Sequence, residues 1–424
     1  MRRKTSSHVP VGTPFEVTDQ TPTLFRPLKI RSVTLRNRIC VSPMCQYSLA
    51  SSGPSVGAVT PLYYTTIGHY VFKGAALAML EATGVNYAGR ISPKCPGLWN
   101  DTQEESLQSL ATFIHSVGGV CGVQLSHGGR KSSTKPPLVA AELGLYSARA
   151  DAKDDGWPED VVGPSGGIDQ VWDGKRPDDP TGGYHSPREM TIEEIQSVVA
   201  DFAKSAQRAV RAGVDVVEIH GAHGYLLHQF LSPLTNRRTD AYGGSFENRT
   251  RLLIEVIRSV RSVVPDTMPV FLRVSATDWM EETVLGRTLG SWDEQSTISL
   301  AMMLPDLGVD LMDVSSGGNH HAARYNVFDA GVRQAEIASR VRAALRTAHK
   351  GLLIGTVGCI TEATTARNIV QLDSLGAAAA DVVFVGRQFL RDPDFVFHAA
   401  VELGVDVQWP PQTRRAKPPP KPSL

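Results

Sequence analysis

Two histidines, His220 and His223, stand three residues apart in the stretch EIHGAHGYL, with Tyr225 two residues further on. Two imidazoles this close could ligate a metal, relay protons or hold a substrate oxygen. A zinc site needs a third ligand, preferably a carboxylate or a thiolate. Glu218 and His127 are available, but their spacing does not by itself bring them to the pair. Metal binding is the less favoured alternative, and we expect a site that acts on a substrate.

A second group of residues could bind anions. Arg273 lies within the otherwise apolar run VFLRVSA, where an unpaired guanidinium is costly to bury. It is expected to face an anion or an electron-rich group, with a structural ion pair as the alternative. Gly358, Gly386 and Arg387 follow the last two apolar runs, and backbone N–H groups beside one cation are typical of phosphate sites in barrels. For Arg387, pairing with Asp392 is the structural alternative.

Short runs rich in β-branched residues must position these side chains, and helical segments separate most of them. Near-continuous apolar runs suit parallel strands that are buried on both faces. Thr191 and Glu194 form a capping box at the start of the clearest helix, and Gly213 provides its left-handed end. The expected strands lie at residues 38–44, 77–85, 120–127, 215–221, 270–276, 311–317, 352–357 and 381–387.

This strand–helix rhythm predicts an α/β fold, a single (β/α)₈ TIM barrel. A doubly wound sheet is the alternative, but no G-x-G-x-x-G follows any of the runs. Active sites of barrels lie at the carboxyl ends of the strands. No expected strand carries a lysine, and Lys131 is expected in a loop, so a Schiff-base aldolase is disfavoured. Other residues at strand ends are Pro43, Met44, Cys45, Tyr47, Glu81, Ala82, Gln124, Arg130 and Ser315 to Gly318.

Segments outside this rhythm define the domain organisation. We expect a flexible N-terminal arm over residues 1–22, the barrel over residues 23–405 and a Pro-rich extended tail over residues 406–424. The connection before Thr191 is long and rich in Gly, Pro and Asp. Because long connections in compact domains are usually functional or disordered, residues 132–187 are expected to form a lid over the opening of the barrel.

The composition of the 424 residues is that of a soluble enzyme, with 42% hydrophobic and 20% charged residues. Lys and Arg (43) balance Asp and Glu (43), which disfavours a nucleic-acid or membrane partner. No apolar run approaches the about 20 residues of a membrane-spanning helix. The five cysteines are odd in number and scattered, so we expect a reducing, cytoplasmic location.

Eight stretches, in this order, resemble the Old Yellow Enzyme family of FMN-dependent ene-reductases. The resemblance extends from about Leu24 to Arg415, and the cysteine and the Arg-bearing tail resemble its thermophilic-like, bacterial and fungal branch. It implies bound FMN, NADPH or NADH as reductant, and a homodimer or larger homo-oligomer. The stretches are SPMCQYS, EATGV, QLSHGGRK, EIHGAHGYLLHQFLSPLTNRRTDAYGGSFENR, LRVSATDW, DVSSGG, TVGCIT and FVGRQFLRDP.

The resemblance also implies roles for individual residues. His220 and His223 would donate hydrogen bonds to the carbonyl oxygen of an α,β-unsaturated substrate, and Tyr225 would deliver a proton to its α-carbon. Tyr47 would lie over the substrate, and Arg415 would reach into a neighbouring subunit's site, with Arg414 as the adjacent alternative. The flavin-binding residues would be Pro43, Met44, Cys45, Ala82, Gln124, His220, Arg273, Gly318, Gly358, Gly386 and Arg387.

Two segments depart from the family pattern. The stretch NVFDAGVRQAEIA (326–338) suggests an altered loop after the sixth strand, and the lid around residues 150–187 is enlarged. These departures leave open a biosynthetic relative that catalyses isomerisation, dehydrogenation or reductive cyclisation of a specialised metabolite. A flavin-free barrel that acts as a binding protein is an alternative of another class, and a metal hydrolase comes last.

Overall fold

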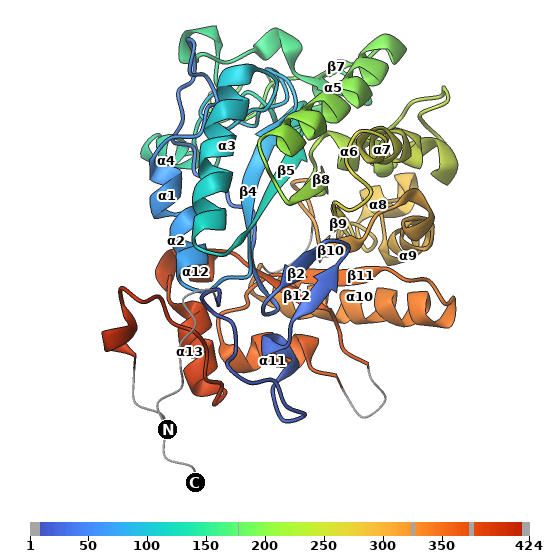
Figure 1. Ribbon diagram of the computed structural model, residues 1–424. Coiled ribbons are helices and arrows are strands. Elements are labelled where there is room, and N and C mark those ends of the chain that lie inside the picture. Colours follow the sequence, from blue (N-terminus) through green and yellow to red (C-terminus); the bar gives the residue numbers. More distant parts are fainter. Residues whose placement is uncertain (1–8, 177, 324–326, 373–376, 418–424) are drawn as a thin grey trace, which may run out of the picture.

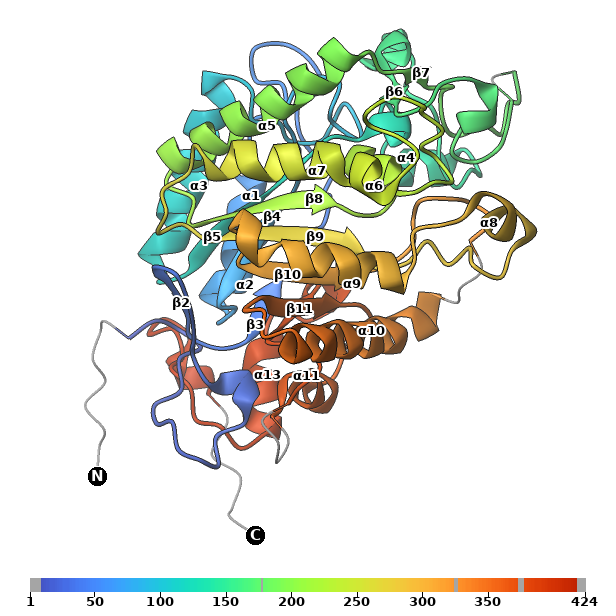
Figure 2. The same cartoon turned by 90° about the vertical axis from the view of Figure 1, so that its right-hand side faces the viewer.

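Eight parallel strands form a closed barrel in sequence order, so the predicted (β/α)₈ fold is confirmed and the doubly wound sheet is wrong (Figures 1 and 2). The computed structural model describes residues 9–176, 178–323, 327–372 and 377–417. The barrel strands are β3 (Ile39–Val41), β4 (Leu77–Gly84), β5 (Val120–Ser126), β8 (Val216–Gly221), β9 (Val270–Ser275), β10 (Leu311–Ser315), β11 (Leu353–Val357) and β12 (Val382–Val385).

Helices surround the barrel in the connections between successive strands (Figure 1). Within the described ranges, none of them is long and apolar enough to cross a membrane. They are α1 (Leu62–Thr65), α2 (Ile67–Phe72), α3 (Asp101–Ser116), α4 (Pro137–Glu142), α5 (Ile192–Arg211), α6 (Leu226–Leu231), α7 (Phe246–Arg261), α8 (Val284–Leu289), α9 (Glu294–Met303), α10 (Val327–Thr347), α11 (Ala363–Val370), α12 (Arg387–Arg391) and α13 (Phe395–Glu402).

Helix α5 shows how the sequence determines these elements. The Thr191 hydroxyl accepts a hydrogen bond from the Glu194 N–H (3.2 Å), and the Glu194 carboxylate accepts one from the Thr191 N–H (2.8 Å). These bonds satisfy N–H groups that have no partner within the helix. Gly213 ends the helix region with a φ of +78°, a conformation that favours glycine. The predicted capping box and stop are confirmed.

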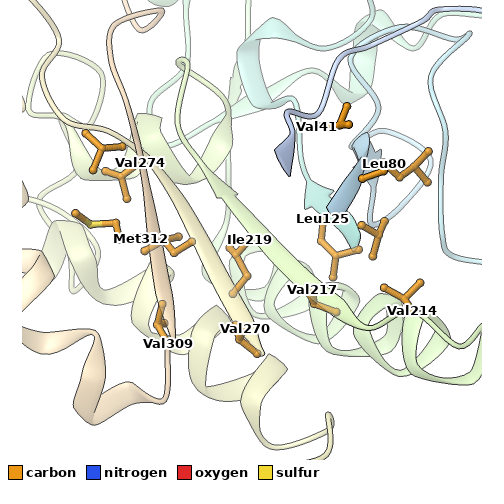
Figure 3. Packing of buried hydrophobic residues seen from close by; sticks show 14 of the residues in the cluster. Val41, Leu80, Leu125, Val214, Val217, Ile219, Val270, Val274, Val309 and Met312 are labelled. Atoms are coloured by element: carbon orange, nitrogen blue, oxygen red, sulfur yellow. The ribbon is translucent and has the colours of Figure 1, made fainter. Parts of the chain in front are cut away.

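The barrel has an outer apolar layer and an inner core, because successive side chains of a strand point to opposite faces. Val217 and Ile219 of β8 belong to the large cluster that packs against the helices, together with Phe202 of α5. Val216 belongs to a separate interior cluster that includes Phe271. Figure 3 shows members of the large cluster, including Leu125, Val217, Ile219, Val270, Val274 and Met312.

A hairpin fills the amino-terminal end of the barrel. Strands β1 (Leu28–Ile30) and β2 (Val33–Leu35) pair in antiparallel fashion. Ile30 and Leu35 are buried in the interior cluster beside Phe384. Because apolar side chains occupy this half of the interior, ligands of the barrel must bind at the opposite half, where the strands end.

The expected flexible N-terminal arm is wrong for Val11–Phe15. The Gly12 N–H donates to the Gln408 carbonyl (2.8 Å), and the Gln408 N–H donates to the Thr13 carbonyl (2.8 Å). Val11 and Val407 are buried by this pairing, so the first residues of the expected tail are packed rather than free. Burial of these two valines stabilises the packing of both segments. Residues 1–8 and 418–424 of the expected arm and tail lie outside the described part.

The stretch 326–338 also differs from the expectation of an altered loop. Helix α10 begins at Val327, so most of this stretch is helical, while residue 326 lies outside the described part. Ile337, Val341 and Leu345 are buried at intervals of four residues. This spacing puts them on one face of the helix, which holds it on the barrel.

Residues 132–187, the expected lid, lie beyond the carboxyl ends of β8 and β9 (Figure 2). The segment holds α4 and several short 3₁₀ turns, and β6 (Val162–Gly163) pairs in parallel with β7 (Arg188–Glu189) just after it. The indole N–H of Trp172 donates to the Gly318 carbonyl (2.9 Å). The segment is therefore attached to the loop after β10.

Candidate active site

Polar side chains fill the barrel interior near the carboxyl ends of the strands. Val216 of β8 faces inward, and strand alternation turns Glu218 and His220 to the same side. The Cα partner of His220 on β9 is Arg273, whose partner on β10 is Asp313. All four polar side chains are buried. The strand register thus brings together residues from distant parts of the sequence.

A cavity of about 470 Å³ opens at this end of the barrel, a size typical of ligand sites. Six of the predicted site residues line it: Met44, His223, Arg273, Gly358, Gly386 and Arg387. Ser42, Ser315 and Arg391 also line it, although the sequence assigned them no role. The cavity therefore extends from His223 of the expected catalytic pair to the expected phosphate site.

The phosphate end of the cavity is formed by the loops after β11 and β12. Gly358 has a φ of +119°, which L-residues with side chains rarely adopt, so the turn requires glycine. The Asp392 carboxylate accepts a hydrogen bond from the His398 ring (2.8 Å), and no ion pair of Asp392 with Arg387 occurs among the described residues. Arg387 faces the cavity as a cation, which suits an anionic ligand group.

Arg273 pairs with a carboxylate, as the structural alternative required, and still lines the cavity. Its Nε donates to Asp313 (2.5 Å), and its Nη2 donates to the Ser42 hydroxyl (2.9 Å). The Gln124 amide donates to Glu218 (2.7 Å). Two buried carboxyl groups thus surround one guanidinium, and full ionisation of both would leave a buried negative charge.

Glu218 holds the proton of this cluster. Burial raises the pKa of Glu218 to about 8, Arg273 opposes the shift and Asp313 adds to it. Burial also raises the pKa of Asp313, but its direct pairing with Arg273 favours the charged form of Asp313. Near neutral pH the cluster is therefore electrically balanced, with Glu218 neutral and Asp313 paired.

The Glu218→Gln variant is expected to show a flatter dependence of stability on pH. Its carboxyl has a higher pKa in the folded protein than its usual value of 4.5, so the folded state binds more protons between about pH 4.5 and about pH 8. Folding stability of the wild type must fall as pH rises through this window, and the amide removes that loss. Urea unfolding at several pH values in excess FMN measures it, with exposed Glu105→Gln as control. Equal slopes for wild type and Glu218→Gln would contradict the assignment.

The two histidines lie against each other at the end of β8. Their ring centroids are 5.1 Å apart, and the Tyr225 ring is 5.0 Å from that of His220. The Ala222 N–H donates to His220 Nδ1 (3.3 Å), which leaves the proton of a neutral ring on Nε2. Burial lowers the pKa of both histidines well below the usual range. His220 is therefore a neutral ring with one N–H to donate.

Ser315 orients the second imidazole. Its hydroxyl lies 2.7 Å from His223 Nε2, and the backbone N–H of His223 donates to the Ser275 hydroxyl (2.9 Å). If the Ser315 hydroxyl donates to Nε2, the neutral ring carries its proton on Nδ1. His223 has a φ of +59°, which residues other than glycine seldom adopt. This strained backbone conformation occurs where the chain places the His223 ring against that of His220.

Tyr225 and Cys45 belong to one small cluster of side chains, and the Tyr225 ring contacts that of His220. Burial, followed by the nearby Cys45, raises the pKa of the Tyr225 hydroxyl well above its usual range. A hydrogen bond with Cys95 and burial raise the pKa of the Cys45 thiol, so neither group is ionised near neutral pH. Tyr47, Cys45 and Tyr225 pack on a small cluster that includes Ala82. Cys45 is thus a neutral thiol, not a nucleophile.

Lys131 lies beside the catalytic pair, where the sequence predicted no role for it. It ends a 3₁₀ turn, Gly129–Lys131, and its Nζ donates to the carbonyls of His223 (2.9 Å) and Gly318 (3.0 Å). Burial and the neighbouring Arg130 lower the pKa of the ammonium to about 7. The position of Lys131, four residues after His127 at a strand end, could have indicated that it lies near the site. Only the fold shows that its turn approaches β8.

A buried pair behind the catalytic loop holds Gly224, the residue between His223 and Tyr225. The Gly224 N–H donates to His228 Nδ1 (2.9 Å), and His228 Nε2 lies 3.0 Å from the Asp278 carboxylate. The other oxygen of Asp278 accepts hydrogen bonds from Ser232 (2.5 Å) and from a backbone N–H. Neither member of the pair has solvent-exposed side-chain surface.

The Asp278→Asn variant is expected to lose about 3 kcal/mol of unfolding free energy, because its buried carboxylate accepts hydrogen bonds from Ser232 and the Trp292 N–H, and a hydrogen bond to a charged group contributes about 1.5–3 kcal/mol. Burial opposes the charge of Asp278, but contacts with His228, Ser232 and the Trp292 N–H lower its pKa overall. Its contribution is therefore lost as pH falls through this lowered value. Urea unfolding measures the loss, with the exposed Asp178→Asn as control. A loss under about 1 kcal/mol would exclude a structural role for the pair.

Some predicted residues lie away from the cavity. Gly318 packs against the backbone of His223, where a Cβ would approach the His223 Cα to 2.8 Å, and it is not part of the cavity lining. Arg415 lies in an exposed 3₁₀ turn, Arg414–Ala416. Its predicted role therefore needs a second copy of the chain. Among the described residues, no cluster of three or more His, Cys, Asp or Glu side chains could hold a metal ion.

The chain is similar to flavin-dependent oxidoreductases over most of its length. The family model described as "NADH:flavin oxidoreductase / NADH oxidase family" matches residues 23–405. A NADH:flavin oxidoreductase of Gibberella zeae is 41% identical, over 91% of this chain and 87% of that protein. A NADPH dehydrogenase of Bacillus subtilis is 35% identical, over 92% and 98%. A solved structure of morphinone reductase in complex with tetrahydroNAD is 27% identical, with a TM-score of 0.65 over 91% of this chain and 92% of that one.

Proposed function

From the premise that this chain belongs to the NADH:flavin oxidoreductase / NADH oxidase family, we propose a role for each residue of the strand-end site. The chain is an FMN-dependent oxidoreductase that uses NAD(P)H, and its activity is that of an ene-reductase. We further propose that the chain's own side chains hold an activated carbon–carbon double bond in place for reduction, with NADPH or NADH as the reductant.

The donor set of the cavity fits FMN. A flavin needs a cation near the electron-rich edge of its ring system and a phosphate site at the end of its side chain. Arg273 provides a cation at the inner wall, and Gly358 with Arg387 provides the anion site. The Gln124 amide does not line the cavity but donates to Glu218 on the neighbouring strand, and we propose that it contacts the edge of the flavin. Pro43, Met44, Cys45, Ala82 and Gly386 complete the proposed flavin-binding set, with His220 at its border. Gly318 is left out of this set, because it lies outside the cavity and packs on the His223 backbone.

FMN, held by these residues, would supply the hydride that the double bond accepts, and NAD(P)H would restore it. His220 and His223 hold the substrate's carbonyl oxygen, each through one N–H of a neutral imidazole. Their two donors stabilise the negative charge that develops on this oxygen, as in an oxyanion hole. Tyr225 donates its proton to the α-carbon, because its hydroxyl is neutral at physiological pH. Tyr47 covers the substrate.

Arg415 belongs, in this proposal, to the site of a second subunit. It is exposed in its own chain and carries a positive charge that could hold a substrate oxygen. We therefore propose a homodimer or larger homo-oligomer. In the described part of the chain, which includes all five cysteines, no disulfide forms, and this supports the cytoplasmic location that we also propose.

The juxtaposition of His220, His223 and Tyr225 beside the Arg273 cavity supports this proposal most directly. The test is anaerobic turnover of a cyclic enone with NADPH by the FMN-loaded protein, followed by mass analysis of the product. A gain of two hydrogens is expected. An unchanged mass would instead support isomerisation, and no product with any enone would contradict the proposed residue roles.

A further inference from the structure

A second pocket lies between the lid and the loop after β10. Its volume is about 610 Å³, within the range of small-molecule sites, and it shares no lining residue with the strand-end cavity. We call it the lid pocket. Its principal lining residues are Lys131, Tyr146, Trp172, Lys175, Tyr184 and His321.

Three aromatic rings form one wall of the lid pocket. The ring of Trp172 lies 4.9 Å from that of Tyr184 and 6.3 Å from that of Tyr146, whose plane is only 13° from parallel. Trp172 is held by its hydrogen bond to Gly318, whereas Tyr146 is 87% exposed. A largely exposed aromatic side chain beside a fixed, parallel one forms an open stacking surface for a flat ring.

Lys131 connects this wall with the catalytic residues. Its Nζ lies 4.6 Å from the ring centroid of Trp172 and 5.2 Å from that of Tyr225. Two of its three N–H groups donate to backbone carbonyls, and no carboxylate forms an ion pair with it in the described ranges. In its protonated form this half-buried side chain has one N–H donor to spare, which suits an electron-rich or anionic group of a ligand.

The rim of the pocket carries mixed charge. Lys175 donates to the Thr181 carbonyl (2.9 Å), and Asp173 accepts hydrogen bonds from the N–H groups of Lys175 and Gly183. Because one carboxylate lies beside one ammonium there, the rim selects neither sign strongly. Recognition by the lid pocket must therefore depend mainly on its aromatic wall and on Lys131.

We propose that the lid pocket is a second binding subsite, which takes a flat aromatic ring system attached to a molecule that reacts at His220, His223 and Tyr225. The inference rests on the proposed function. Two molecules that enter the site could carry such a ring: an enone with an extended aromatic substituent, and the reductant through its adenine. The shared chemistry is a stacking ring with an electron-rich group directed at Lys131.

Tyr146→Ala and Tyr146→Phe form a matched pair, because both remove the exposed hydroxyl and only the first removes the ring. Leu138→Ala, at another exposed position of the lid outside the pocket lining, is the control. The two half-reactions of the FMN-loaded enzyme are measured separately by stopped flow. One compares a naphthyl-substituted with a monocyclic enone, and the other compares NADPH with reduced nicotinamide mononucleotide, which lacks adenine.

Tyr146→Ala is expected to raise the Kd of either the naphthyl enone or NADPH about 5- to 10-fold, as loss of one aromatic contact should. Tyr146→Phe should stay within about 2-fold of wild type, and so should the two small ligands with every variant. An effect on the enone identifies the substrate as occupant, and an effect on NADPH identifies the adenine. Unchanged Kd values for both large ligands would overturn the proposal.

An equilibrium measurement separates this outcome from failure of the proposed function. A saturated naphthyl ketone and adenosine 2′,5′-bisphosphate are titrated into the oxidised holoenzyme, with binding followed by quenching of tryptophan fluorescence. Neither ligand can react, so weaker binding of one of them to Tyr146→Ala supports the subsite even if no enone is reduced. Binding of both with wild-type affinity to Tyr146→Ala counts against it.

Discussion

The double variant His220→Ala/His223→Ala is expected to bind FMN and to be reduced by NADPH, yet to lose kcat/KM for a cyclic enone by about 10⁴-fold or more. Loss of one donor to a developing oxyanion typically costs about 10²–10³ in rate. The two imidazoles are neutral and 5.1 Å apart, with His220 buried and His223 half-buried, so each can donate one N–H to the same oxygen. Among the described residues, no other side chain beside the two histidines can replace both of their N–H donors.

Separate measurement of the half-reactions checks this prediction. The loss should appear in the reaction with the enone, where charge develops on the carbonyl oxygen. The variants His220→Asn and His223→Asn should each retain part of the rate, because an amide keeps an N–H donor. His398→Ala, at an exposed position, controls for loss of any histidine. Enone reduction by the double alanine variant at one tenth of the wild-type rate or faster would remove the pair from the mechanism.

Tyr225→Phe is expected to slow reduction of the enone by about 10²–10⁴-fold, the range that general acids typically contribute. The variant loses only the hydroxyl, while the packing of its ring against His220 at 5.0 Å remains. Burial and Cys45 keep the pKa of the hydroxyl high, so its proton is present throughout the neutral range. Between about pH 6 and about pH 9, kcat should therefore show no inflection from Tyr225.

A quinone provides the control for Tyr225→Phe, because its reduction places the proton on oxygen and needs no acid at carbon. Tyr225→Phe should reduce a quinone at close to the wild-type rate. The exposed Tyr87→Phe should leave both substrates unaffected. Equal losses with the enone and the quinone would indicate a disturbed site instead of a missing proton donor.

The barrel could be predicted because its signals are local. Each strand is a short apolar run, and the capping box at Thr191 and Glu194 depends only on neighbouring residues. The pairing of Val11–Phe15 with residues 406–408 could not be predicted, because it joins opposite ends of the sequence and a few scattered valines give no periodic signal. The start of α10 was not predicted, although Ile337, Val341 and Leu345 recur at helical spacing. The expectation of an altered loop came from comparison with the family pattern and not from this spacing.

The placement of polar side chains at the strand ends was predictable from the apolar runs that precede them, as for His220, His223, Arg273 and Arg387. Glu218 and Asp313 carried a signal that was available: each is a charged residue inside an apolar strand, in phase with inward-facing neighbours. Their partners could not be predicted, because strand register decides which charges meet.

The parts missed altogether come from loops. Lys131 reaches His223 through a 3₁₀ turn, and Trp172 reaches Gly318 from the lid. The positions of such contacts depend on backbone paths that no periodicity encodes. A lysine near a strand end is therefore best judged after the fold is known.

Closure of the barrel also determines when the protein can fold during its synthesis. Strand β3 pairs with β12, and the Arg38 side chain donates to the Asp381 carbonyl, 343 residues later. At about 5–20 residues per second, a ribosome needs roughly 20 to 70 s to deliver the second partner. Until then β3 has an unpaired edge, and an exposed edge invites association with other chains. Nascent chains of this protein thus pass through an open state that chaperones must shield.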